Sequence, residues 1–245
     1  MDVGLEAMII IILILIIIYL LYLNNYNRLL LKVKSTYDNN EYYVQDSNYS
    51  LRAANLIAQI RERINTLVEH LGKIYPNDER TILLKKNYRE NSIKEGIEDP
   101  RYTSYSVNKG EEIILCLTKK REQEQEQEQE QEQEQEQDNN LMDINTMMFV
   151  VLHELGHLSS VSVGHTTEFW NNFKWILEES INIGIYMRQD FDTKPVEYCG
   201  MSITSTPLDD INTTNFNIKK GDNLEFDTNA GKLIEAFILD YNYLK

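Results

Sequence analysis

A chain of 245 residues, 42% of them hydrophobic, is long enough for one domain with a core of ordinary size, with or without appendages. Its formal net charge is −15, but eight of the glutamates belong to the glutamate–glutamine repeat at 122–137, which leaves −7 for the remainder. Because no sustained run of Lys or Arg offsets this acidic balance, direct nucleic-acid binding is not favoured.

The N-terminal region contains seventeen residues without a charge, 7–23, which read AMIIIILILIIIYLLYL. As a helix this segment would be roughly 25 Å long, close to the lower limit for crossing a hydrocarbon core of about 30 Å. A core helix and a cleaved signal peptide are the alternatives, but the acidic residues before the segment and the lack of a small-residue cleavage pattern after it favour an uncleaved anchor. Arg28, Lys32 and Lys34 follow it, so the positive-inside rule predicts a single-pass protein with a cytosolic C-terminal body.

These features divide the chain into three predicted parts. Residues 1–34 are expected to form a transmembrane anchor with a basic flank, and the polar, Asn/Tyr-rich stretch 35–50 a linker. The rest, 51–245, is expected to be one domain. It begins with an amphipathic helix that ends at Gly72, because apolar residues recur there at three- and four-residue intervals, and a second, shorter helix is expected at 78–88.

Residues 103–118 predict a β-hairpin, with turn residues at 108–110 and the apolar run IILCLT as its second strand. The glutamate–glutamine stretch within 121–140 has no apolar surface to bury, so we expect a solvated insertion in the loop that follows the hairpin. Cys116 and Cys199 fit no metal-binding spacing; two buried small hydrophobic residues are favoured over a disulfide.

The sequence 143–160 predicts a buried central helix, because apolar side chains cover most of its circumference and Asp143 or Asn145 can cap it. A further amphipathic helix is expected after His165, with Thr166 or Thr167 as its N-cap. The tail combines turn signals with short β-like runs such as MSIT, and ends in a helical pattern at 232–244.

The motif HELGH at 153–157 predicts a metal site. Histidines four positions apart lie only about 40° apart around a helix, so His153 and His157 can bind one ion. Glu154 lies beside that site and suits a base that takes a proton from a metal-bound water, which zinc makes acidic enough at neutral pH. Two histidines and a glutamate on a mostly apolar helix would be costly to bury without such a partner.

A catalytic zinc site needs a third protein ligand and an open fourth position. His165 lies eight residues after His157, and Gly164 lets the chain leave the helix and fold back. Glu178 and Glu179, on the following helix, are the alternative, at a spacing where other HExxH enzymes have a glutamate ligand. His165 is favoured, because the apolar positions of that helix already define its buried face.

The run NTMMFVVLHELGHLSSVSVGHTTEFW, 145–170, resembles the WLM domain family of SprT-related zinc metallopeptidases. In that family a third His and then a Phe-Trp or Phe-Tyr pair follow the HExxH helix. The GHTxxFW form, with YCGM at 198–201, is similar to metallopeptidase-like proteins of large DNA viruses. The resemblance covers 100–205 and implies zinc ligands at His153, His157 and His165 and a catalytic Glu154. The second-to-third His spacing is longer than in typical cellular members, and no DNA- or SUMO-binding appendage is evident. We therefore do not extend the cleavage of DNA–protein crosslinks from that family to this chain.

We therefore expect an α+β fold: a mainly helical, zincin-like metallopeptidase domain with a small β-hairpin or sheet, preceded by one transmembrane helix. The predicted function is a zinc endopeptidase that acts on a protein substrate from a host-cell membrane, or from a virion membrane if the protein is viral. Two alternatives remain open. One is a gluzincin-type protease that uses Glu178 or Glu179, and the other is a membrane or virion component in which zinc is only structural. Oligomeric state is not predicted.

Overall fold

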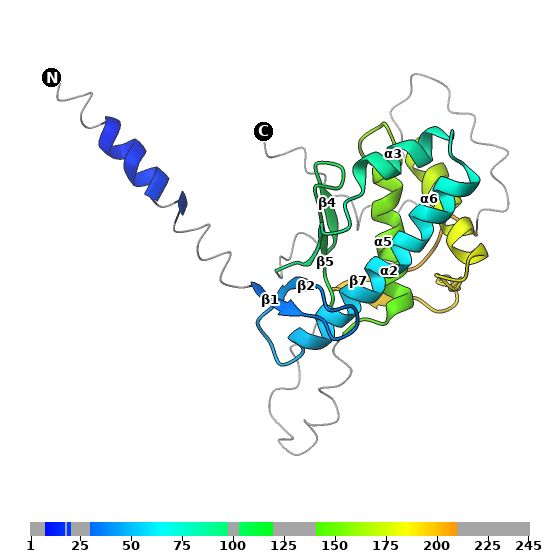
Figure 1. Cartoon of the computed structure of the whole chain (residues 1–245), viewed down its shortest axis with the longest axis horizontal. Coiled ribbons are helices and arrows are strands. Elements are labelled where there is room, and N and C mark those ends of the chain that lie inside the picture. The colour runs from blue at the N-terminus through cyan, green and yellow to red at the C-terminus, as the bar shows by residue number, and fades with distance from the viewer. Residues whose placement is uncertain (1–7, 18, 21–29, 98–102, 120–140, 210–245) are drawn as a thin grey trace, which may run out of the picture.

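The structure is a computed structural model of the whole chain, and it describes residues 8–17, 19–20, 30–97, 103–119 and 141–209. The elements, in chain order, are β1 (Leu30–Lys34), β2 (Glu41–Gln45), α2 (Ser50–Ile74), α3 (Glu79–Asn87), β3 (Ile93–Glu95), β4 (Tyr105–Val107), β5 (Glu112–Leu115), α5 (Ile144–Leu158), α6 (Thr167–Asn182), β6 (Val196–Tyr198) and β7 (Met201–Ile203) (Figure 1). The fold is α+β, as predicted. The expected helix at 232–244 and the insertion at 121–140 lie outside the described residues.

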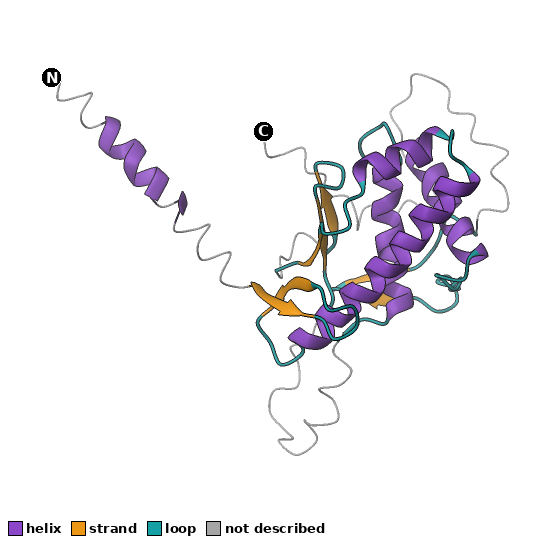
Figure 2. Ribbon diagram, in the orientation of Figure 1, coloured by secondary structure: helices purple, strands orange, loops and turns teal. Residues whose placement is uncertain are grey.

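The centre of the domain is α5, whose side chains are buried on nearly every side. Asp143 caps its N-terminus by accepting hydrogen bonds from the backbone N–H groups of Asn145 and Thr146. The helices α2, α3 and α6 all pack against α5, and the strands β4 and β5 lie along the flank of this helical layer (Figure 2). A helix that is apolar almost all round has to lie in such a position, because any exposed face would leave apolar surface in water.

The described part of the chain contains three small sheets. The predicted hairpin is confirmed, since β4 and β5 pair antiparallel around the turn at 108–110. The strand β3 pairs with β5 in parallel, which leaves β4 at one edge of a three-stranded sheet with the order β3-β5-β4. The strands β6 and β7 form a separate antiparallel pair. The first predicted helix runs on past Gly72 to Ile74.

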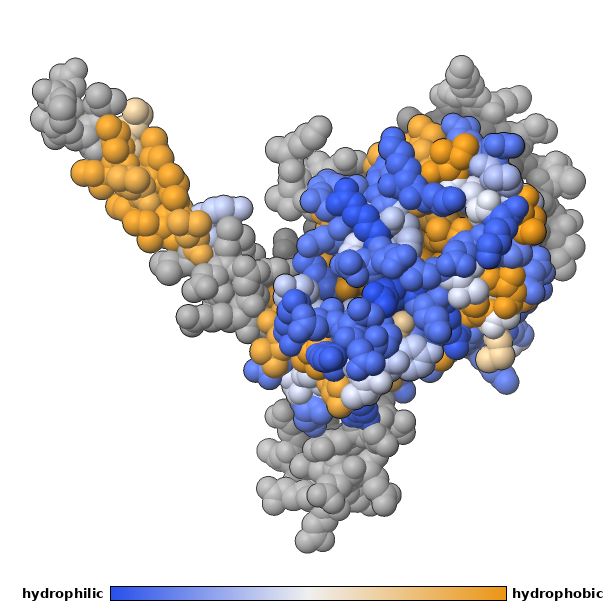
Figure 3. Space-filling view, in the orientation of Figure 1, coloured by the Kyte–Doolittle hydropathy of each residue, from blue (hydrophilic) through white to orange (hydrophobic). Residues whose placement is uncertain are grey.

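The N-terminal apolar segment corrects a prediction. Among the described residues, no helix combines the length and the apolar character needed to cross a membrane. This finding contradicts the transmembrane anchor within 1–34 and the single-pass localisation expected from it. The continuous helical stretch described there is 8–17, which at 1.5 Å per residue extends only about 15 Å. Its apolar side chains are exposed, and Figure 3 shows them as an uninterrupted hydrophobic surface.

Two further expectations differ from the structure. The stretch 35–50 was expected as a linker, but it contains β2, which pairs with β1 and packs on α2. Tyr42 and Val44 alternate with exposed residues and are buried there, so this short strand has an inner face. Cys116 and Cys199 are not two independent buried thiols: they form a disulfide that links residues 83 positions apart in the sequence.

Candidate metal centre

The helix α5 carries three of the predicted site residues. His153 and Glu154 are each only 3% exposed, and His157 is partly buried one turn further on. The 3.6-residue period of the helix places the two imidazoles on one face, and their ring centroids lie 5.0 Å apart. The sequence therefore predicted correctly that these two rings share a site.

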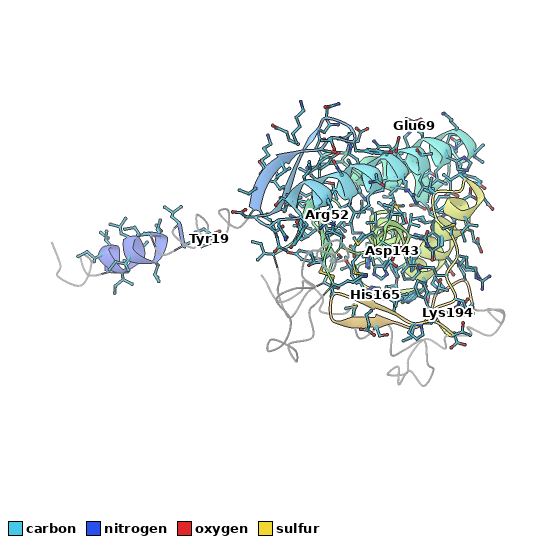
Figure 4. All side chains as sticks on the ribbon, turned by 90° about the horizontal axis from the view of Figure 1, so that it is seen from below. Tyr19, Arg52, Glu69, Asp143, His165 and Lys194 are labelled. Carbon is cyan, nitrogen blue, oxygen red and sulfur yellow. A yellow bond between two sulfur atoms is a disulfide. The ribbon has the colours of Figure 1, made fainter. Side chains whose placement is uncertain are left out.

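The third imidazole comes from the loop between α5 and α6 (Figure 4). Gly164 has a φ of 80°, a left-handed conformation that suits glycine, and it turns the chain back so that His165 faces α5. The Nε2 atoms of His165 and His153 are 3.0 Å apart. One ring nitrogen from each of His153, His157 and His165 lies within 4.8 Å of the others, so this group could hold a metal ion.

The geometry of this three-histidine site fits a small tetrahedral ion. With Zn–N bonds of about 2.1 Å, neighbouring ligand nitrogens around zinc are separated by about 3.4 Å. The 3.0 Å between the Nε2 atoms of His153 and His165 is close to that value, and no pair of ligand nitrogens in the group is more than 4.8 Å apart. Three neutral nitrogen donors also form a ligand set that suits zinc and other late first-row metals better than calcium or magnesium.

Aromatic side chains of α6 form the wall behind the three imidazoles. Phe169 contacts all of them: its ring centroid lies 4.8 Å from that of His153, 4.2 Å from that of His157 and 4.8 Å from that of His165. Trp170 lies against His165 at 5.7 Å. The Phe-Trp pair singled out in the sequence therefore packs directly on the site.

Burial keeps the α5 histidines neutral. It lowers the pKa of His153 well below its usual value, and the two neighbouring imidazoles lower this pKa further. Burial is also the main reason why the pKa of His157 falls to about 3, with His165 and Lys109 adding to the effect. A neutral imidazole is the form that binds a metal, so both rings are in their ligand form throughout the neutral range.

The side chain of Glu154 is buried and lies next to the strand β4. Burial raises its pKa to about 7, and hydrogen bonds from the side chain and the backbone of Ser106 offset part of that rise. A carboxyl group with a pKa near neutrality can both accept and release a proton at physiological pH, which a solvated glutamate does poorly. Ser106 was not predicted from the sequence, because its contact with α5 joins distant parts of the chain.

The alternative ligands Glu178 and Glu179 do not join the site. Glu178 is exposed. The carboxylate of Glu179 is buried, but one of its oxygens lies 3.0 Å from His70 Nε2 and the other accepts a 2.8 Å hydrogen bond from Tyr75. His70 thereby connects α2 to α6 through this carboxylate.

Residues outside the motif hold the ligand loop, and the sequence did not single them out. Lys109, in the β4–β5 turn, and Glu168, in the first turn of α6, both bind the backbone of 160–162. Asn87 and Asn172 donate to the carbonyl groups of Leu158 and Ser159 at the end of α5. The only sequence pattern that points to this region is the turn at 108–110. It predicts the hairpin but not the contact between that turn and the loop at 160–162.

The fold and the site define an α+β protein with three histidines grouped around a buried helix. Uncharacterized protein R325 of Acanthamoeba polyphaga mimivirus is 30% identical to the chain over 175 residues, which is 70% of this chain and 81% of that protein. Uncharacterized protein 136R of Invertebrate iridescent virus 6 is 30% identical over 153 residues, 58% of this chain and 72% of that protein. The chain therefore belongs to the viral protein family that includes these two. No family model matches the sequence, and no solved structure matches the fold.

Proposed function

We propose that the protein is a zinc-dependent endopeptidase. The observation that carries this proposal is that α5 carries the buried Glu154 between two of the three converging imidazoles, His153 and His157. A zinc site that serves only to hold a fold does not need a buried carboxyl group next to its ligands, because burying such a group is costly. The resemblance to WLM-type metallopeptidases supports the same function.

The residues of the site have distinct roles under this proposal. His153, His157 and His165 hold the ion, which when bound supplies a Lewis acid able to acidify water and polarise a carbonyl group. Glu154 accepts a proton from the attacking water and delivers it to the leaving amine. Its pKa of about 7 matches both steps, since neither protonation state is strongly favoured at neutral pH.

The edge strand β4 supports a peptide as the substrate. An extended peptide can pair with the edge of a strand through its backbone, and within the described part of the chain β4 has a strand neighbour, β5, on one side. Ser106 belongs to β4 and bonds to Glu154, so this edge and the proposed base are adjacent. A peptide paired there would lie beside the three histidines.

The test uses the full-length chain, because β1 and β2 belong to the fold and a truncation after residue 34 would remove β1. Purified wild type, Glu154→Gln and Glu178→Gln are compared for zinc content and for cleavage of an unfolded protein such as reduced casein. We expect all three to bind one zinc, and only Glu154→Gln to lose activity, by about 10²–10⁴-fold. Glu178→Gln is the matched control, because it changes an exposed glutamate by the same single group.

A chelator should abolish the wild-type activity, and added zinc should restore it. Zinc bound at one equivalent without any Glu154-dependent cleavage would contradict the proposal and leave zinc as a structural component of the fold.

A further inference from the structure

A single lysine binds three consecutive carbonyl groups of the loop that carries His165. The Nζ atom of Lys109 donates to the backbone oxygens of Ser160, Val161 and Ser162 at 2.8, 2.6 and 3.3 Å. These carbonyl groups follow the end of α5, where backbone acceptors have no partner within the helix. The ammonium group of Lys109 is therefore the donor that these three carbonyl groups share.

The turn that presents Lys109 has little freedom to move. Asn108 and Lys109 both have left-handed backbones, with φ values of 45° and 53°, and Gly110 follows with a φ of 98°. Even a Cβ atom at Gly110 would lie 2.5 Å from the backbone oxygen of Asn87 and 2.8 Å from Leu158. The turn is thus pressed against the ends of α3 and α5, which fixes the place from which the lysine reaches the loop.

Glu168 binds the same loop from α6. Its two carboxylate oxygens accept hydrogen bonds from the N–H groups of Val161 and Ser162, at 2.7 and 2.9 Å. Apolar packing does little to hold this part of the chain, because the side chains of Val161 and Val163 are 61% and 64% exposed. The loop conformation therefore depends on these polar contacts, with a cation on its carbonyl groups and an anion on its amides.

We propose that Lys109 and Glu168 are positioning residues that hold His165 at the metal site. Two ligands on one helix are placed by the helix itself, whereas the third depends on the path of the chain from 159 to 165. Replacing a residue that orients a metal ligand without touching the metal typically lowers the metal affinity by about 10–100-fold. This inference deepens the proposed function and rests on the metal site that it includes.

The first experiment measures zinc affinity by competition with a chromophoric chelator. We expect Lys109→Met to weaken zinc binding by about 10–100-fold. Methionine keeps an unbranched, apolar side chain but removes all three donors. Lys94→Met is the matched control: Lys94 lies in the same sheet, pairs with Glu112 at 2.7 Å and loses the same charge, but makes none of the loop contacts. Its zinc affinity should equal that of the wild type.

A second variant tests the other side of the loop. Glu168→Gln leaves only one acceptor oxygen for the two amides, so we expect a smaller loss of zinc affinity than in Lys109→Met, with Glu178→Gln unchanged. Lys109 and Glu168 are both partly exposed, so we expect both variants to keep the fold, and thermal unfolding of the metal-free proteins checks this.

Combination with His165→Ala separates positioning from a general effect on stability. If Lys109 acts through His165, adding Lys109→Met to His165→Ala should weaken zinc binding no further. The effects of two substitutions on zinc affinity do not add when the residues act through one another. The visible spectrum of the Co²⁺-loaded protein gives an independent signature, since it reports the ligands around the ion. The spectrum of Lys109→Met should shift toward that of His165→Ala.

The outcomes distinguish this inference from the proposed protease activity, because no substrate is involved. Additive losses in the double variant, or an unchanged zinc affinity in Lys109→Met, would overturn the positioning role while leaving the protease proposal intact. If the variants lose zinc affinity as expected but the wild type cleaves no substrate, the positioning role holds and the proposed protease activity is overturned. A wild-type protein that binds neither zinc nor Co²⁺ would overturn both.

Discussion

Glu154 contributes to stability in a pH-dependent way that its replacement should reveal. Its pKa is about 7 in the folded protein, against 4.5 for an ordinary glutamate. A group whose pKa is raised by folding stabilises the protein below its unfolded pKa, and that contribution is lost as the pH rises through its folded pKa. Wild type should therefore lose stability between pH 4.5 and about 8 relative to a variant that is neutral at this position.

We expect the free energy of unfolding of metal-free Glu154→Gln to exceed that of wild type by up to about 3 kcal/mol between pH 5 and pH 8.5. The difference should be largest at the higher pH. Urea unfolding in the presence of a chelator measures this difference. The nearby histidines titrate in both proteins, so their contribution largely cancels in the comparison. Glu178→Gln, on the exposed face of α6, should show no such trend, and a difference independent of pH would refute the expectation.

Phe169 provides a second test at the level of single residues. Phe169 and Phe191 are both fully buried, but of the two only Phe169 contacts the three imidazoles in the described part of the structure. Replacing either by leucine should lower the free energy of unfolding by about 1–2 kcal/mol. Only Phe169→Leu should also weaken zinc binding, as measured by chelator competition. Equal effects of both variants on zinc affinity would show that the aromatic wall does not orient the ligands.

At the scale of elements, the contact between α5 and α6 depends on a glycine. A Cβ atom at Gly156 would lie 3.0 Å from Phe169 and 3.1 Å from Phe173. Alanine has the higher helix propensity, by about 1 kcal/mol, but overpacking a well-packed contact costs about 1–3 kcal/mol. Because Phe173 contributes its Cβ and its backbone here, the neighbour cannot simply rotate away, and we expect a net loss of stability.

Gly72, inside α2, is the matched control. Its added Cβ would meet only the side chain of Lys85, nearest at the flexible Nζ end. Gly72→Ala should therefore be neutral or stabilise the protein by up to about 1 kcal/mol, whereas Gly156→Ala should destabilise it. Urea unfolding of the two variants beside wild type measures both changes, and a stabilised Gly156→Ala would show that the two helices can move apart freely.

The elements also show which features sequence reasoning can reach. The histidines of α5, its Asp143 cap and the turn at Gly164 were predictable because helix period, capping and left-handed glycine act over a few residues. The strand β2 was missed because only two of its residues, Tyr42 and Val44, form an apolar pattern within a polar stretch. Ser106 and Lys109 were missed because their partners on α5 and its loop are about fifty residues away in sequence.

At the scale of the whole molecule, the disulfide joins the segment after β5 to the β6–β7 hairpin. Cys116 follows β5, and Cys199 lies in the turn between β6 and β7. Beside the disulfide, Tyr198 donates a 3.0 Å hydrogen bond to the carbonyl of Cys116 and bonds to Ser104, just before β4. The β6–β7 hairpin is thereby held against the sheet whose edge strand contacts Glu154.

A crosslink between residues 83 positions apart should stabilise the fold substantially. Closing so long a loop restricts the unfolded chain, and native disulfides of this kind contribute about 2–4 kcal/mol. We expect the variant with both cysteines changed to serine to have a free energy of unfolding about 2–4 kcal/mol below that of oxidised wild type. Its urea midpoint should be lower accordingly. A reductant should lower the wild-type midpoint toward that of the variant and leave the variant itself unchanged. Identical midpoints for oxidised wild type and the variant would show that the remaining contacts of the hairpin already hold it in place.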